Sequence, residues 1–118
     1  MEGFRFEKLD IWKKAIEVGD KLYDVSEVAN DKKFYRFAEQ LRAASLSISN
    51  NIAEGSGSVS NKEFASFLNI ARRSVFECAN ILYVFQRREL LTESQRLSLY
   101  HDLIDLSRSI YYFRQTLL

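Results

Sequence analysis

The sequence contains no proline, only four glycines and a single cysteine in 118 residues. Proline kinks helices and glycine weakens them, so a chain with so little of either can form long uninterrupted helices. The lone Cys78 excludes a disulfide within the chain. It fits a reducing compartment, in which thiols stay unpaired.

Long hydrophobic runs are also absent. No apolar stretch approaches the ~20 residues that a membrane span requires, and the N-terminal residues are charged rather than an apolar signal core. We therefore expect a cytoplasmic protein that does not enter a membrane.

An excess of one charge is absent as well. Lysine and arginine number 17 against 16 acidic residues, with nine against ten in residues 1–54 and eight against six in residues 55–118. Proteins that neutralise nucleic-acid phosphates usually carry a strong positive excess. The net charge therefore does not support nucleic-acid binding, although a local basic patch stays possible.

Hydrophobic residues make up 47% of the chain and charged residues 28%, as in an ordinary globular protein. The length fits one domain, residues 1–118. Apolar residues recur every three or four positions in 8–29 and again in 35–54, which predicts two helices. Gly55 follows the second, where a left-handed cap residue is expected.

Two further helices begin at capping signals. Ser60 stands three residues before Glu63, and Thr92 stands three before Gln95, which is the capping-box spacing. Apolar rows follow both signals. Because the three connections are short, we predict an all-α fold, an antiparallel up-down-up-down four-helix bundle.

Each predicted helix carries a second apolar row beside its first. Leu9, Trp12, Ile16, Gly19 and Tyr23 form such a row in 8–29. A small monomeric bundle needs one apolar stripe per helix, and aromatic residues are favoured at interfaces. A thick core with scattered surface aromatics is the alternative to a homo-oligomer. The candidate interface residues are Trp12, Tyr23, Phe76, Tyr83, Tyr100 and Tyr111.

One segment is similar to a known signature. Residues 47–55, Ser-Ile-Ser-Asn-Asn-Ile-Ala-Glu-Gly, resemble the Ser-Ile-x-x-Asn-Ile-Ala-Glu-Gly hallmark of the bacterial proteins encoded in ribosomal RNA intervening sequences, often described as ribosomal-protein-like. Lys62-Glu63-Phe64 and Ile70-Ala71-Arg72 match further positions, as do residues 9–12 and 40–44 upstream. The resemblance covers nearly the whole chain.

The resemblance implies a four-helix bundle assembled into a ring-like homopentamer. It also implies kinship with the accessory protein of diversity-generating retroelements, which binds nucleic acid and a reverse transcriptase. That protein is strongly basic, whereas this chain is nearly neutral. We predict a non-enzymatic assembly or binding module of unknown protein partner, with RNA binding as the alternative.

Two groups of polar residues are candidate binding sites. Asn50, Asn51 and Glu54 lie near a predicted helix end, where they either bind a partner or satisfy nearby backbone groups. The second group consists of three arginines that could contact phosphate or remain solvated surface charges, one of them paired with Glu77 four residues later. These are Arg42, Arg72 and Arg73.

No catalytic or cofactor pattern is evident. Arg96 and His101 match the loose spacing of a helical ribonuclease, which leaves a remote nuclease alternative. One histidine and one cysteine are too few for a zinc site, so we predict no metal and no cofactor. Cys78 lies on an apolar row and is expected to be a buried, inert thiol.

Overall fold

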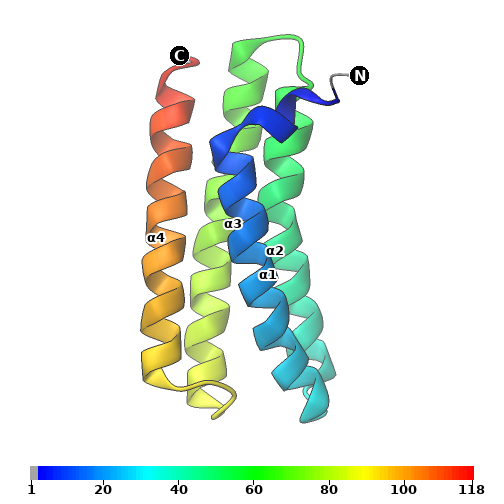
Figure 1. Cartoon of the computed structure of the whole chain (residues 1–118), viewed down its shortest axis with the longest axis vertical. Helices are drawn as coiled ribbons and strands as arrows, with labels where there is room; N and C mark the ends of the chain where they lie inside the picture. Colours follow the sequence, from blue (N-terminus) through cyan, green and yellow to red (C-terminus); the bar gives the residue numbers. More distant parts are fainter. Residues whose placement is uncertain (1–2) are drawn as a thin grey trace.

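The computed structural model describes residues 3–118, which form a short 3₁₀ helix and four long α-helices, with no strand in that range. The 3₁₀ helix η1 spans Arg5–Lys8. It is followed by α1 (Asp10–Asp31), α2 (Tyr35–Ser56), α3 (Asn61–Arg87) and α4 (Glu93–Gln115). Figure 1 shows successive helices running in opposite directions, so that η1 and the C-terminus lie at the same end of the bundle.

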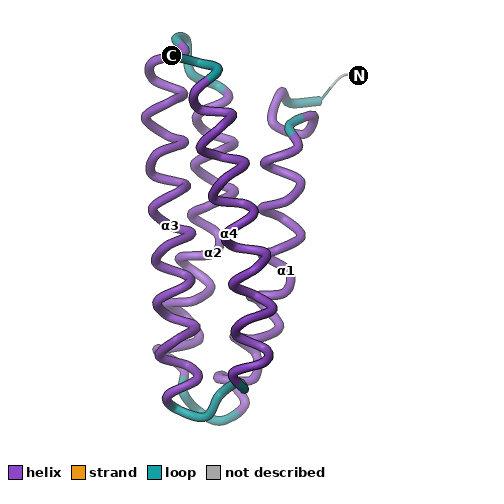
Figure 2. The backbone as a smooth tube through the Cα atoms, turned by 90° about the vertical axis from the view of Figure 1, so that its left-hand side faces the viewer, coloured by secondary structure: helices purple, strands orange, loops and turns teal. Residues whose placement is uncertain are grey.

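The helices are arranged as a four-sided bundle in chain order. Contacts join α1 to α2, α2 to α3, α3 to α4 and α4 back to α1, and none joins diagonal helices within residues 3–118. The tube in Figure 2 shows the long helices side by side, connected by short loops at their ends. The seam between α1 and α2 therefore lies on the side of the bundle opposite the seam between α3 and α4.

The first apolar row of each helix forms the core, as the spacing predicts. Buried members include Leu22 of α1, Ile48 of α2, Leu82 of α3 and Leu103 of α4. Several positions differ from expectation: Ala38 and Ile81 join the core, whereas four residues of the predicted rows are only half-buried, namely Val25, Phe37, Phe113 and Leu117.

Both predicted helix starts are confirmed. Ser60 Oγ accepts a hydrogen bond from the Glu63 amide at 3.1 Å. Thr92 Oγ1 accepts from the Gln95 amide at 3.1 Å, and the Thr92 amide donates to Gln95 Oε1 at 2.8 Å. The Thr92 cap has both hydrogen bonds of a capping box. The Ser60 cap has, among the residues that the structure describes, only the bond from the Glu63 amide to the serine hydroxyl.

The prediction of a left-handed cap at Gly55 is wrong. Gly55 is a buried helical residue of α2, and the helix continues to Ser56. A Cβ atom at Gly55 would lie 2.7 Å from Phe67 Cβ and 2.8 Å from Phe64 Cδ1 of α3. Glycine is required here because α2 and α3 pack too closely for any side chain, and not because the backbone is left-handed.

Left-handed backbone occurs instead at two residues that are not glycine. Lys33 follows α1 with φ 68°, and Glu89 follows α3 with φ 61°. In each case the amide of the following residue donates a hydrogen bond to the carbonyl five residues earlier. The Phe34 amide donates to the Ala29 carbonyl at 2.8 Å, and the Leu90 amide donates to the Phe85 carbonyl at 2.9 Å. This is the Schellman arrangement that ends many helices.

Candidate interaction surfaces

The polar segment near the end of α2 divides into an inward and an outward part. Asn51 is half-buried, and its Nδ2 donates to the Ser47 carbonyl at 2.7 Å and to Ser47 Oγ at 3.0 Å. Ser47 Oγ in turn lies 2.9 Å from Ser74 Oγ of α3. Asn51 thus supports the contact between α2 and α3, whereas Asn50 and Glu54 are exposed.

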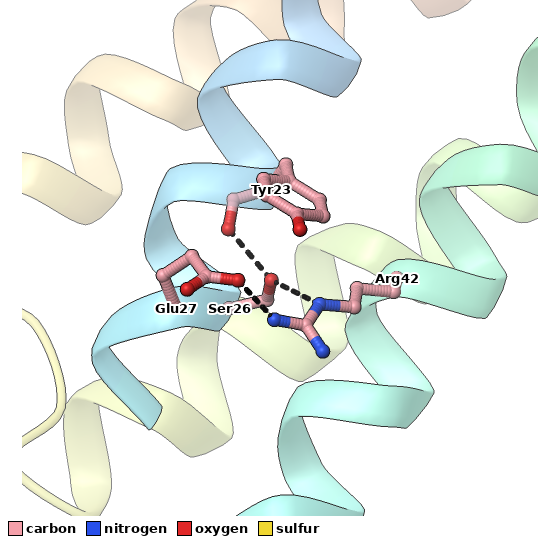
Figure 3. Close-up of polar contacts among 4 residues, drawn as sticks. All are labelled: Tyr23, Ser26, Glu27 and Arg42. Atoms are coloured by element: carbon pink, nitrogen blue, oxygen red, sulfur yellow. Dashed lines mark hydrogen bonds and ion pairs between the residues drawn. The ribbon is translucent and has the colours of Figure 1, made fainter. Parts of the chain in front are cut away.

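Arg42 is held by residues of its own subunit, as Figure 3 shows. Its Nε donates to Ser26 Oγ at 2.9 Å, Nη2 contacts the Glu27 carboxylate, and the guanidinium lies 5.0 Å from the Tyr23 ring centre. Ser26 Oγ donates to the Tyr23 carbonyl at 2.6 Å. The cluster ties α2 to α1 and largely neutralises Arg42, so this arginine is poorly placed to bind a phosphate.

The other two candidate arginines differ from each other. Arg72 of α3 lies between two rings, 5.2 Å from the centre of Phe76 and 5.5 Å from that of Tyr111. Its Nε has no hydrogen-bond partner in the part of the chain that is described. Arg73 is exposed, and the ion pair with Glu77 considered from the sequence is not among those formed by residues 3–118.

The six predicted interface aromatics are placed in two ways. Tyr23, Phe76, Tyr83 and Tyr111 are exposed. Trp12 and Tyr100 are half-buried against the core; Trp12 packs on Phe6 with ring centres 5.0 Å apart, and the Tyr100 hydroxyl donates to the Ala79 carbonyl at 2.9 Å. The exposed rings belong to two separate faces of the bundle.

The first, the α1/α2 face, is a groove. Its hollow has a volume of about 360 Å³. Small residues form its floor and larger apolar ones stand at its edges, Tyr23 being 54% and Leu46 58% exposed. The residues that define this face are Ala15, Ile16, Gly19, Asp20, Tyr23, Arg42, Ser45, Leu46 and Ser49.

The second, the α3/α4 face, carries protruding side chains. Phe76 is 58% exposed and Ile104 49%. A smaller hollow of about 190 Å³ lies between them. The α3/α4 face comprises Val75, Phe76, Ala79, Tyr100, Leu103, Ile104 and Ser107, with Arg72 and Tyr111 beside Phe76.

The seam between α1 and α4 is polar by contrast. Lys14 Nζ donates to Ser109 Oγ at 3.0 Å, and Lys21 Nζ pairs with Asp102 at 2.8 Å. This hydrogen bond, together with the negative charge of Asp102, raises the pKa of Lys21. Exposed ion pairs of this kind contribute little to stability.

The residues of the nuclease alternative do not form an evident site. Arg96 contacts Gln86 through Nε and lies 5.1 Å and 4.7 Å from the ring centres of Tyr83 and Tyr100, while His101 is exposed.

Burial, followed by the charge of Glu77, raises the pKa of Cys78 to about 12. No metal-binding cluster of histidine, cysteine or carboxylates occurs among residues 3–118.

Sequence reasoning did not single out Leu46 for the α1/α2 face, and it placed Gly19 in the second apolar row without giving it a role of its own. Leu46 lies off the core row of its helix, and Gly19 stands in the middle of a long helix, where glycine is unfavourable. The position of Gly19 in mid-helix was the signal that the sequence offered for this face.

None of the helices within residues 3–118 is long and apolar enough to cross a membrane.

The described residues form an all-helical bundle with exposed apolar faces. The sequence matches the family described as 23S rRNA-intervening sequence protein over residues 7–112, and the chain belongs to that family. No curated protein matches it.

The structure is similar to a crystal structure of a protein of unknown function from the S23 ribosomal protein family of Bacteroides thetaiotaomicron. The TM-score is 0.82 and the sequence identity 23%, with 88% of this chain and 97% of that chain covered. At this identity the likeness shows the shared fold.

Proposed function

We propose that this protein is a non-enzymatic scaffold that works by assembling with copies of itself. The observation that carries the proposal is the pair of exposed apolar faces on opposite sides of one bundle. A single patch would suit a two-fold dimer, in which the same surface meets itself. Two different patches suit head-to-tail contacts, which close into a ring when the rotation between neighbours permits.

The dimensions of the bundle support an interface of ordinary size. The principal extents are 43 × 27 × 20 Å, so a long side of 43 × 20 Å offers about 860 Å². A stable protein–protein contact buries about 800 Å² on each partner. Within the family to which the chain belongs, a homopentamer is our expectation for the number of subunits.

Light scattering coupled to gel filtration tests this proposal. Five subunits of 13.8 kDa give 69 kDa. We expect a mass of several subunits at micromolar concentration, with the pentamer as the preferred value. A monomer under these conditions would contradict the proposal, because the exposed aromatics would then remain in water.

A nucleic-acid-binding accessory role, with RNA as the first ligand to test, is the second candidate. The arginine–aromatic pairs of the α3/α4 face favour it, since Arg72 and Arg96 each lie against two aromatic rings. Bases stack on such rings in single-strand-binding proteins. The net charge of +1 opposes it.

Fluorescence anisotropy with labelled single-stranded RNA at several salt concentrations separates the two candidates. Because phosphate binding releases counterions, a true nucleic-acid site would weaken steeply as salt rises. We expect weak binding or none near physiological salt. Tight, salt-sensitive binding that is lost in Arg73→Ala or Arg72→Ala would put the second candidate first.

A further inference from the structure

The starting observation is a glycine that the subunit does not need. Gly19 lies in the middle of α1, where glycine destabilises a helix relative to alanine. A Cβ atom at this position would meet only Ser45 Oγ, at the ordinary contact distance of 3.5 Å. Packing within the subunit therefore requires glycine at position 55 and not at position 19.

The missing side chain of Gly19 deepens the groove of the α1/α2 face. Ala15, Ser45 and Ser49 are the other small residues beside the hollow of about 360 Å³. A cavity of about 150 Å³ holds a benzene molecule in another protein. The groove is therefore large enough to receive an aromatic side chain from outside.

The opposite side of the same molecule presents a side chain of that kind. Phe76 of α3 is 58% exposed, although it is a large apolar residue. Arg72 lies 5.2 Å from its ring centre, which restrains the ring on one side. Ile104 of α4 stands across the small hollow from it and is also exposed. Phe76 is thus a partly fixed, protruding group of the α3/α4 face.

Asp20 on one face and Arg72 beside the other carry opposite charges. Asp20 lines the groove and forms no ion pair with any residue in the range 3–118. Arg72, next to Phe76, likewise has no carboxylate partner in that range. Opposite charges across an interface favour the correct partner and orientation.

We propose that the α1/α2 groove of one copy receives Phe76 and the surrounding α3/α4 face of a second copy, with Asp20 facing Arg72. This pairing rests on the self-assembly proposed above and specifies which surfaces meet. Gly19 is the central position of the receiving face and Phe76 that of the inserting face. Each copy uses both faces at once, so the contact propagates from one subunit to the next.

Two variants that each disable one face test the pairing. Gly19→Trp places a large side chain in the groove and leaves Phe76 free. Phe76→Glu removes the inserting ring and leaves the groove open. Ala43→Trp and Val59→Glu introduce the same side chains at exposed positions outside both faces and serve as matched controls. Circular dichroism checks that all four variants remain helical.

Light scattering on the separate and mixed variants gives the decisive result. We expect each face variant to have the mass of one subunit, while both controls keep the mass of the wild-type assembly. An equimolar mixture should form a complex of two subunits and nothing larger. The intact groove of Phe76→Glu would hold the intact Phe76 of Gly19→Trp, and the other two faces would be disabled.

The outcomes separate the pairing from the general proposal of self-assembly. If wild type assembles but the mixture remains monomeric, or Gly19→Trp assembles like wild type, the pairing is wrong and self-assembly stands. If Gly19→Trp alone forms a dimer, the α3/α4 face meets itself and the pairing is also wrong. A monomeric wild type overturns both proposals.

The ion pair has a test of its own by charge exchange. Asp20→Arg and Arg72→Asp should each weaken the assembly, because like charges then face each other across the contact. The double variant restores opposite charges and should recover part of the wild-type mass. If the double variant is no better than the single ones, Asp20 and Arg72 do not face each other.

Discussion

Replacing the two helical glycines by alanine should have opposite effects on stability. Gly19→Ala gains helix propensity of about 0.8–1.0 kcal/mol. Its Cβ would meet only Ser45 Oγ at 3.5 Å, so nothing in the subunit opposes the gain. We expect a stabilisation of roughly 0.5–1 kcal/mol relative to wild type.

Gly55→Ala has the same propensity gain but meets a fixed obstacle. Its Cβ would lie 2.7 Å from Phe67 Cβ, an atom that side-chain rotation cannot move. The helices α2 and α3 must therefore separate, and overpacking of this kind costs about 1–3 kcal/mol. After the propensity gain is subtracted, we expect a net loss of up to about 2 kcal/mol.

The assay is thermal unfolding followed by circular dichroism at two protein concentrations, so that any contribution of association appears as concentration dependence. For a chain of this length, 1 kcal/mol corresponds to about 4 °C in Tm. The two variants should therefore melt roughly 8 °C apart, with Gly19→Ala the more stable. If Gly55→Ala is as stable as Gly19→Ala, the close approach of α2 and α3 is wrong.

Three further predictions concern the ends and the surface of the helices. Ser60→Ala and Thr92→Ala should each lower the free energy of unfolding by about 0.5–2 kcal/mol in denaturant titrations, through loss of the cap; a change near zero at Thr92 would contradict its two observed bonds. Lys33→Gly and Glu89→Gly should raise stability by up to about 1 kcal/mol in the same titrations, because glycine adopts positive φ without strain; loss of stability in both would count against the left-handed backbone there. Leu103→Glu should unfold the bundle by burying an unpaired charge, whereas Tyr111→Glu should keep its helicity and lower the assembled mass; equal loss of circular dichroism signal in the two variants would show that Tyr111 belongs to the core.

The sequence allowed the helices and their starts to be predicted because those features depend on local patterns. The three- and four-residue spacing around Leu22, Ile48 and Leu103 specifies a helix face whatever lies opposite it. Ser60 and Thr92 bond to amides only three residues away, so the partner is visible in the sequence.

The failures concern features that depend on a neighbouring helix. Gly55 has the appearance of a helix cap, and only the position of Phe67 on α3 shows that it is a packing residue. The true left-handed residues, Lys33 and Glu89, carry side chains that no rule of turn composition selects. Glycine in this chain is placed where helices approach closely, and ordinary residues bear the strain at the helix ends.

The candidate surfaces show the same division between local features and features that depend on a neighbouring helix. Second apolar rows predicted that aromatic residues would be left outside the core, and Tyr23, Phe76, Tyr83 and Tyr111 are exposed. The pairing of Arg42 with Ser26 and Glu27 could not be predicted, because it depends on how α2 is rotated against α1. A charge that looks available in a sequence can be neutralised by a helix that precedes it.

The helix pairs of the bundle differ in how extensively they pack, and this difference affects how a head-to-tail contact between subunits would close. The helices α2 and α3 make the most extensive contact in the bundle, helped by Gly55, while α1 and α4 make the least extensive one. In the proposed assembly we therefore expect the cross-section of the bundle to be narrower on the α2/α3 side than on the α1/α4 side. Repeated contacts between the inclined α1/α2 and α3/α4 faces would curve toward the narrow side and form a ring rather than a straight filament. The polar α1/α4 seam, with Lys21 and Asp102, would then face the solvent outside, and the exposed Ile70 of α3 would face the lumen.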